Sequence, residues 1–283
     1  MEIVLAILAA LMFSLGTVLQ QKVASEVPDD ETMKAGLLVR LAKRPVWLLG
    51  ITVDGLGFLC QAAALHFGKL VVVQPLLATS VVFALPLGRW ITKRRITRND
   101  LLGALAVTGG LVLFLVLADP QGGVQDASTS GWIISGAIAA VVCFGLVFAS
   151  RGKRPSPKAA LLGMSAGILF GFSAGLTLTV TDDLDQGLVA LLTDWHLYAL
   201  IAVGWISMTL SQASLQTGAL APAISTQMSL DPLVSILLGV VIFQERIDDT
   251  FLEAAVALLG LVLMVFGLVI LSRSQAHDES SQT

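Results

Sequence analysis

The sequence predicts an all-α polytopic membrane protein. Of the 283 residues, 55% are hydrophobic and only 13% are charged, and the mean hydropathy is +0.85, whereas roughly 25% of the residues in a soluble domain are charged. Apolar segments of about 20 residues, enough helix to cross a hydrocarbon layer of roughly 30 Å, recur along the whole chain. We predict nine spanning helices, at residues 3–23, 46–67, 70–90, 101–118, 131–150, 159–180, 196–217, 220–243 and 251–272.

The basic residues fall almost entirely on one side of the predicted helices. Of the 17 Lys and Arg residues, 15 lie in the loops after the first, third, fifth and ninth spans or at the span ends beside these loops, and only Lys69 and Arg246 lie on the opposite side. Loops rich in Lys and Arg stay in the cytoplasm. We therefore expect a multi-pass protein of the cell (plasma) membrane, with its N-terminus outside and its C-terminus in the cytoplasm.

Two stretches of the chain repeat each other at one separation. Upstream, LMFSLG at 11–16 resembles ILFGFS at 168–173 at a slightly different offset. Each copy holds four predicted spans and one apolar piece too short to cross a membrane, residues 36–42 or 187–193. The most specific matches are identical pairs 151 residues apart, namely Gln61 with Gln212 and Gly88 with Gly239.

The predicted helix at 131–150 inverts the second copy, because four helices return the chain to its starting side. Charge agrees with the inversion, since KRRITRND at 93–100 is basic and its counterpart QERIDDT at 244–250 is acidic. Inverted repeats are typical of secondary transporters. The predicted organisation is a first transmembrane repeat at 1–118, a linker helix with loops at 119–158, a second repeat at 159–272 and a disordered cytoplasmic tail at 273–283.

The end of the second copy resembles a known family signature. In DPLVSILLGVVIFQERIDDTFLEAAVALLGLVLMVFGLVIL, a proline is followed after twelve residues by Glu245, then Ile247, then a glycine-containing apolar helix. This pattern resembles the closing signature of the drug/metabolite transporter (EamA-like) superfamily. The first-copy segment GKLVVVQPLLATSVVFALPLGRWITKRRITRNDLLGALAVTGGLVLFL is similar to the NIPA-type magnesium transporter branch. The copies differ at two positions, since Arg94 stands opposite Glu245 and Ser80 opposite Asp231.

Two acidic residues lie well inside predicted spans, Asp54 and Asp231. A charge at this depth costs roughly 2.5 to 3.5 kcal/mol on insertion scales, so such residues usually face a cavity or a partner. Pro232 follows Asp231 and frees the carbonyl of Met228, which would give a cation several oxygen ligands, or the carboxylate could carry a proton. The alternative is that each Asp is a neutral packing residue hydrogen-bonded to a neighbouring helix.

Other polar residues are predicted near the same depth. We expect Asp54 and Asp231 to share one cavity with the polar face of the third span. Gln20, Gln21 and Lys22 are interpreted as an interfacial anchor, and Glu245 as a solvated or locally ion-paired helix end. Besides the two acids, the candidate substrate or ion ligands are Gln61, Gln212, Gln74, Ser80 and Gln227; buried glutamines can equally serve to cross-link helices.

The predicted function is secondary transport of a small solute by alternating access through a polar cavity in mid-membrane. One alternative is a magnesium or other divalent cation transporter in which Asp54 and Asp231 bind the metal. Another is a membrane accessory protein that transports nothing. With a single tyrosine, Tyr198, and few deep charges, the sequence does not indicate an aromatic cage for organic drugs.

Enzymatic motifs are absent from the sequence, which contains no HExxH, no GxSxG, no cluster of Cys and His, no P-loop and no dinucleotide fingerprint. We therefore expect no catalysis and no cofactor. The expected partners are the lipid bilayer and a small-molecule or cation substrate, without nucleic acid. Faces of small residues would permit a homodimer.

Overall fold

The computed structural model of the chain describes residues 1–24, 44–91, 96–118, 121–123, 127–215, 217, 219–246 and 251–280. The predicted short piece at 36–42 lies outside these residues. In chain order the elements are α1 (Glu2–Ala24), α3 (Pro45–Phe67), α4 (Leu70–Ala78), α5 (Ser80–Ile91), α6 (Arg98–Ala118), β1 (Gln121–Gly122), α7 (Thr129–Ser150), α8 (Pro155–Asp185), α9 (Leu188–Thr193), α10 (Trp195–Leu215), α11 (Leu220–Val241), β2 (Glu245–Arg246) and α12 (Phe251–Ser280). β1 and β2 pair antiparallel.

The predicted all-α membrane fold is confirmed. Within the described part of the chain, seven helical segments are long and apolar enough to cross a membrane, with α4 and α5 counted together as Leu70–Ile91, and Ala255–Leu271 forms a shorter apolar helix. Helix α6 also has 21 residues and coincides with the fourth predicted span. Helix α9 lies in the predicted short piece at 187–193.

Two predicted segments differ from the structure. The third span is not one continuous helix, because the chain turns at Thr79 between α4 and α5, and each half contains a proline, Pro75 or Pro86, that lacks a backbone N–H. The predicted disordered tail is helical to Ser280. Residues 273–280 contain no Gly or Pro, so the helix can propagate from the apolar part of α12 at little cost.

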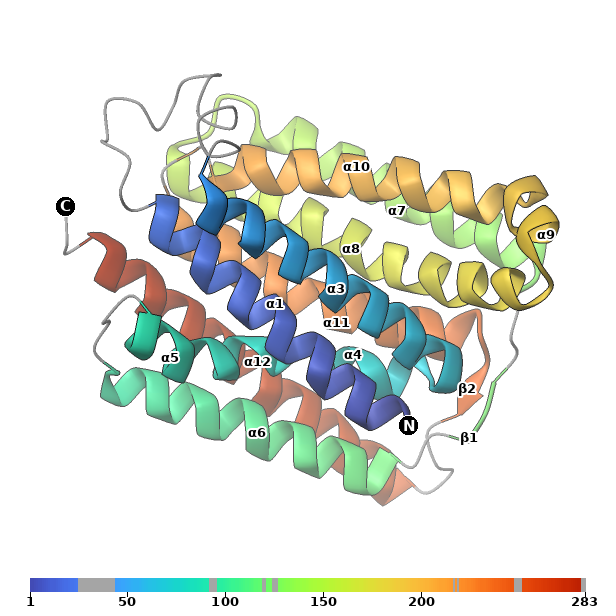
Figure 1. Cartoon of the computed structure of the whole chain (residues 1–283), viewed down its shortest axis with the longest axis horizontal. Helices are drawn as coiled ribbons and strands as arrows, with labels where there is room; N and C mark the ends of the chain where they lie inside the picture. The colour runs from blue at the N-terminus through green and yellow to red at the C-terminus, as the bar shows by residue number, and fades with distance from the viewer. Residues whose placement is uncertain are drawn as a thin grey trace.

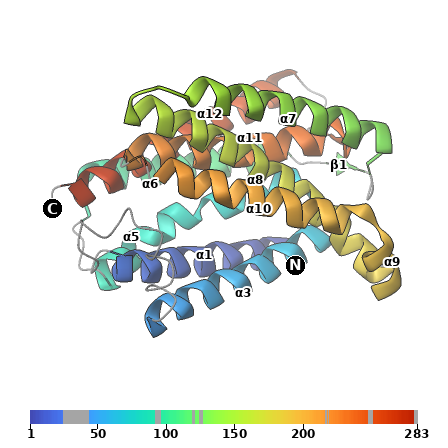
Figure 2. The same cartoon turned by 90° about the horizontal axis from the view of Figure 1, so that it is seen from above.

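The two halves of the chain run in opposite directions. Figure 1 shows the helices lying roughly along one common direction, with the N- and C-termini toward opposite ends, and Figure 2 shows the same arrangement from above. Helix α1 runs toward the end where the chain terminates, whereas its counterpart α8 runs away from it. Across the halves, α6 packs along α12 and α4 packs against α11, as expected for inverted copies.

Glycines allow α8 and α11 to approach closely. Along one face of α8, a Cβ at Gly163, Gly167 or Gly171 would lie 2.5 to 2.6 Å from a backbone carbonyl oxygen of α11. Any side chain there would force the helices apart. Close approach of small residues is how helices gain packing energy in a membrane, where apolar burial between helices brings little. The partner carbonyl at Gly171 belongs to Asp231, so this contact fixes the depth of that residue.

Local sequence explains where helices begin. Ser128 caps α7 by accepting a hydrogen bond from the Gly131 N–H at 3.2 Å. Pro155 opens α8, where its missing N–H costs nothing. Thr97 and Asp100 form a reciprocal cap at the start of α6, with Thr97 N–H donating to Asp100 Oδ2 at 2.8 Å and Asp100 N–H donating to Thr97 Oγ1 at 3.2 Å.

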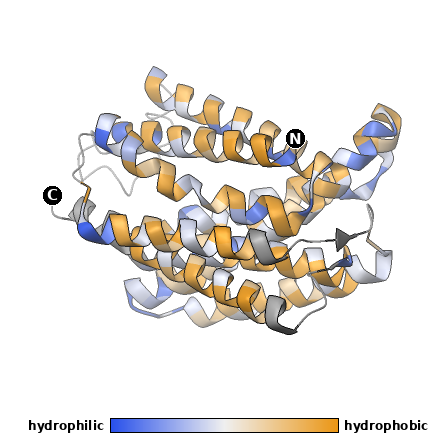
Figure 3. Cartoon of the chain, turned by 90° about the horizontal axis from the view of Figure 1, so that it is seen from below, coloured by the Kyte–Doolittle hydropathy of each residue, from blue (hydrophilic) through white to orange (hydrophobic). Residues whose placement is uncertain are grey.

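Helix α7, the predicted linker, presents large apolar side chains outward. Val141 and Phe144 are 72% and 73% exposed, and the buried residues of the helix are Trp132, Cys143 and Ser150. Figure 3 shows hydrophobic residues along the middle of the helices and hydrophilic residues gathered toward their ends. Such an exposed apolar surface suits contact with lipid.

Candidate functional site: a cavity between the two halves

A cavity of about 640 Å³ lies between the inverted halves of the chain. Helices α1, α3, α4 and α5 line it from the first half, and α8, α10, α11 and α12 line it from the second. Asp231 stands near the middle of α11, eleven residues after Leu220 and ten before Val241, so the cavity reaches the middle of the membrane-spanning region. Five of the predicted ligands line it: Gln61, Gln74, Ser80, Gln227 and Asp231.

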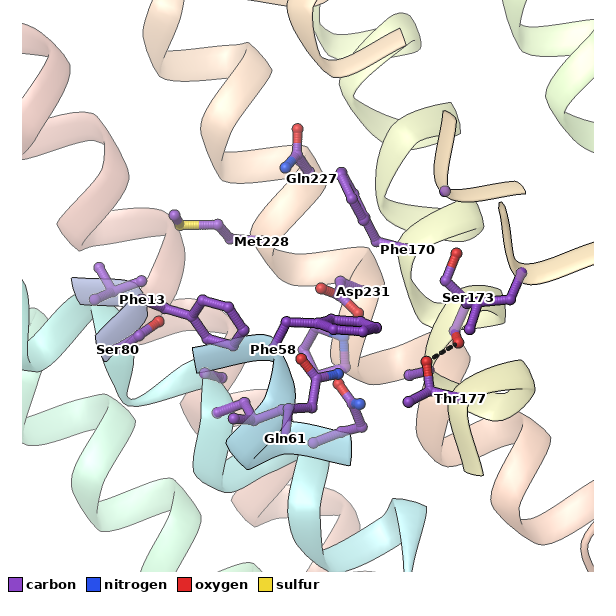
Figure 4. A pocket seen from close by; sticks show the side chains of 18 of the residues that line it. Phe13, Phe58, Gln61, Ser80, Phe170, Ser173, Thr177, Gln227, Met228 and Asp231 are labelled. Atoms are coloured by element: carbon purple, nitrogen blue, oxygen red, sulfur yellow. Dashed lines mark hydrogen bonds between the residues drawn. The ribbon is translucent and has the colours of Figure 1, made fainter. Parts of the chain in front are cut away.

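Asp231 is the only ionisable side chain among the described residues that line the cavity. Figure 4 shows its carboxyl group in the space bordered by Phe13, Phe58 and Phe170. Aromatic faces carry negative partial charge and attract cations. The cavity therefore has negative electrostatic character without any basic side chain to offset it.

The polar side chains of the cavity differ in the hydrogen bonds that they form. Gln74 is 4% exposed, and its Nε2 has no hydrogen-bond partner among the described residues. Gln227 accepts a hydrogen bond from Ser211 Oγ at 2.8 Å through Oε1. Ser173 and Thr177 donate their hydroxyl hydrogens to backbone carbonyls one turn earlier in α8, at 2.9 and 2.8 Å. Gln74 is thus a buried donor available to a bound solute, and the two hydroxyls offer acceptor lone pairs.

Asp54 does not line this cavity, so the prediction that Asp54 and Asp231 share one pocket is wrong. Asp54 Oδ2 instead accepts a hydrogen bond from Gln20 Nε2 at 2.5 Å. A Cβ at Gly16 would overlap the Asp54 carboxylate, and one at Gly50 would lie 3.0 Å from the Gly16 carbonyl oxygen. The glycines therefore bring α1 and α3 together around Asp54. Gln20, interpreted above as an interfacial anchor, is its partner between these helices.

Gln212 is likewise absent from the cavity lining, although its repeat partner Gln61 is present. The cavity includes Leu197 to Gly204, the first half of α10, and none of the residues near its end. Gln212 lies at that opposite end. The inversion of the repeats places equivalent residues at opposite depths, so one conformation exposes only one member of the pair.

Glu245 is buried rather than solvated, which corrects its sequence interpretation. It is 3% exposed, and its two oxygens accept hydrogen bonds from the Leu70 and Val71 N–H groups, both at 2.9 Å. These groups open α4, which has no side-chain cap of its own. Burial raises the pKa of Glu245, and the two N–H donors and Lys69 oppose that shift. The family-like Glu245 thus ties the second half of the chain to the first.

The three phenylalanines of the cavity were not predicted as site residues. A signal for two of them was present in the repeat, because Phe13 in LMFSLG aligns with Phe170 in ILFGFS. Both line the cavity from matching helices, α1 and α8. The expectation that the chain lacks an aromatic cage rested on its single tyrosine and did not consider phenylalanine.

Comparison with known proteins agrees with a transporter. Residues 35–116, which include α3, α4, α5 and most of α6, match the EamA-like transporter family. A protein of Corynebacterium glutamicum, described only as uncharacterized, is 26% identical over 283 residues, covering 100% of this chain and 98% of the relative. No solved structure matches the chain. The match of residues 35–116 to this family supports a membrane transporter of the drug/metabolite transporter superfamily.

Proposed function

We propose that this protein is a secondary transporter of the drug/metabolite transporter superfamily that carries a small neutral or cationic organic solute. The observation that supports this proposal is the single carboxylate, Asp231, in a cavity of about 640 Å³ bordered by three phenylalanines. Binding sites for small molecules typically enclose about 300 to 1,000 Å³ and combine apolar walls with a few polar groups.

The charge of the cavity sets the solute class. A bound cation can pair with Asp231 and rest against Phe58 or Phe170. An anion would meet a like charge in a low-dielectric site, which costs several kcal/mol. We therefore propose an amine or other organic cation as the preferred solute, with the free amide hydrogens of Gln74 providing a further contact.

Alternating access follows from the inversion. In the present conformation Gln61 lines the cavity and Gln212 does not. We propose that rocking of the two halves closes this cavity and opens one at the opposite end, where Gln212 takes the place of Gln61. The turn at Thr79 and the prolines of α4 and α11 supply backbone that can bend at the level of Asp231.

The division into two repeats and the membrane orientation predicted from the sequence are also part of this proposal. The repeats at 1–118 and 159–272 would rock about each other in the plasma membrane, joined by the linker at 119–158. Basic residues at the start of α8 and the end of α7 lie at the same end of the bundle as the C-terminus. The positive-inside rule places that end in the cytoplasm and the N-terminus outside.

A magnesium transporter of the NIPA type is the second candidate. In its favour, the cavity that contains Asp231 is also lined by Gln61, Gln74, Ser80 and Gln227, whose side chains carry oxygen atoms, and hydrated Mg²⁺ often uses only one or two carboxylates. The two-carboxylate site expected from the sequence is not formed, because Asp54 bonds to Gln20. With one carboxylate and three phenylalanines, the cavity therefore suits an organic cation better than Mg²⁺.

Uptake into proteoliposomes distinguishes these functions. The purified chain would be offered labelled organic cations, neutral amides, organic anions of similar size and Mg²⁺, each with and without an imposed pH gradient. The proposal expects saturable uptake of organic cations and little uptake of anions. Mg²⁺ flux without organic uptake would favour the NIPA-type function, and no flux of any solute would favour an accessory protein.

A further inference from the structure

A histidine and two aspartates meet outside the cavity, where α8 ends and α10 begins, beside the short helix α9 (Figure 1). His196 Nδ1 lies 2.6 Å from Asp194 Oδ1 and 3.9 Å from Asp183 Oδ2. One ligand atom from each residue lies within 4.8 Å of the others. The three side chains come from two different helices and the segment between them, so the fold and not local sequence brings them together.

The backbone holds this cluster in place. Asp194 directly precedes α10, and its Oδ1 also accepts the His196 backbone N–H at 2.9 Å, as a helix cap does. The His196 ring packs between Trp195, at a centroid distance of 4.0 Å, and Trp132, at 5.5 Å. His196 Nε2 has no hydrogen-bond partner among the described residues. Nδ1 is the ring nitrogen that faces the two carboxylates.

Burial and charge indicate a cation at this position. His196 and Asp183 are 4% and 9% exposed, whereas the Asp194 side chain is 34% exposed. The cluster is thus enclosed by protein and open to solvent at one ligand. Besides the imidazole nitrogen of His196, the cluster offers two carboxylates, so one nitrogen and two oxygen ligands lie close enough together to reach a single cation.

We propose that His196, Asp183 and Asp194 form a binding site for a divalent first-row transition ion such as Zn²⁺, with water completing the coordination. One imidazole and two carboxylates suit Zn²⁺, whose ligand distances are about 2.0 to 2.2 Å. Mg²⁺ prefers an all-oxygen octahedral site and does not favour imidazole. His196 Nδ1 and Asp194 Oδ1 lie 2.6 Å apart, so a bound ion would replace the proton between these two atoms.

The bound ion would join the two helices that form one wall of the cavity. Leu197, the residue after His196, lines the cavity, and so does Thr177, which precedes Asp183 on α8 by six residues, or about 9 Å of helix. An ion held by both helices would restrain their separation at this end. The site does not depend on the proposed transport, and it can be tested without any flux measurement.

Binding of Zn²⁺ by the full chain, purified without a histidine tag, tests the site. Competition with a fluorescent zinc indicator should show saturable binding of a single ion per chain, and the melting temperature should rise with Zn²⁺ concentration but not with Mg²⁺. Asp183→Asn and His196→Gln should each weaken binding by about tenfold or more. Asp194→Asn is the most informative variant, because asparagine still caps the helix but no longer offers an anionic ligand.

The matched control is the other histidine–aspartate pair at this end of the molecule, His66 and Asp185, whose Nδ1 and Oδ2 lie 3.4 Å apart. His66→Gln and Asp185→Asn should leave zinc affinity unchanged. Unaltered affinity in folded Asp194→Asn and His196→Gln proteins would overturn the proposal, and so would the absence of saturable binding by the wild-type chain.

Discussion

Replacement of Glu245 tests the contact that joins the two halves of the chain. Its carboxylate accepts the first two N–H groups of α4, both at 2.9 Å, and α4 has no other side-chain cap. Hydrogen bonds to a charged group contribute about 1.5 to 3 kcal/mol each, so the pair is worth about 3 to 6 kcal/mol before the cost of burying the carboxylate. We expect Glu245→Ala to lower the free energy of unfolding by about 2 to 4 kcal/mol at pH 7.

Denaturant-induced and thermal unfolding of the detergent-solubilised protein measure this change. Glu245→Gln keeps one carbonyl acceptor and removes the cost of burying a charge, so it should lose less stability than Glu245→Ala. Glu2→Ala is the control, because the Glu2 side chain is 35% exposed and forms an ion pair with the adjacent N-terminus; its effect should stay within about 0.5 kcal/mol. If Glu245→Ala were as mild as Glu2→Ala, the two hydrogen bonds would not stabilise the fold and the reasoning would be refuted.

The same residue gives a pH dependence of defined sign. Burial raises the pKa of Glu245 above its ordinary value of 4.5, so the folded chain holds this proton more tightly than the unfolded chain does. The stability that protonation adds is fully present below pH 4.5 and is lost as the pH rises through the folded-state pKa. The stability difference between wild type and Glu245→Gln should therefore be largest in acid and decrease toward neutral pH; an increase would contradict the direction of the shift.

Two further predictions concern packing and orientation. Gly171→Ala should cost about 1 to 3 kcal/mol of stability because its Cβ would lie 2.6 Å from the Asp231 carbonyl, whereas Gly145→Ala, with open space around it, should be neutral or stabilising by up to about 1 kcal/mol; equal melting temperatures for the two variants would argue against the close packing of α8 and α11. In intact cells, a membrane-impermeant thiol reagent should label Ser130→Cys, at the start of α7, and not Ser156→Cys, at the start of α8; the reverse pattern would overturn the proposed orientation.

The sequence predicted the helices well because membrane insertion leaves a simple signal. A span needs about 20 apolar residues, and nearly every predicted segment coincides with a helix or, at 70–90, with the pair α4 and α5. The turn at Thr79 was missed because proline is tolerated within membrane helices, and Pro232 indeed lies inside a continuous α11. A proline alone therefore does not tell where a span is broken.

The site was predicted in part for a similar reason. Depth along a span can be counted, and the mid-span residues Asp231 and Ser80 do line the cavity. In contrast, the sequence does not show which neighbouring helix a given helix face contacts. Asp54 lies seven residues before Gln61 on α3, or about 10 Å along the helix, and at that level Gly16 and Gly50 bring α1 against it. Such a pairing depends on tertiary packing.

The contacts of Glu245 likewise depend on tertiary packing and could not be predicted from the sequence. Its position beside a helix end indicated solvent exposure, yet its hydrogen-bond donors, Leu70 and Val71, come from the first copy, 175 and 174 positions earlier. Gly239 makes room for the carboxylate, since a Cβ there would lie 2.5 Å from Glu245 Oε2. The repeat alignment shows where the two copies are equivalent, but it does not show where they touch.

Binding and uptake of an organic cation by Asp231→Asn protein tests the central claim most directly. Loss of the carboxylate should weaken cation binding by about tenfold or more, since a charge-assisted contact contributes about 1.5 to 3 kcal/mol, while a neutral solute of the same shape should bind nearly as before. Asp54→Asn, which removes the other deep acid without altering the cavity lining, should keep the wild-type affinity. Equal cation affinity in wild-type and Asp231→Asn protein would contradict the account.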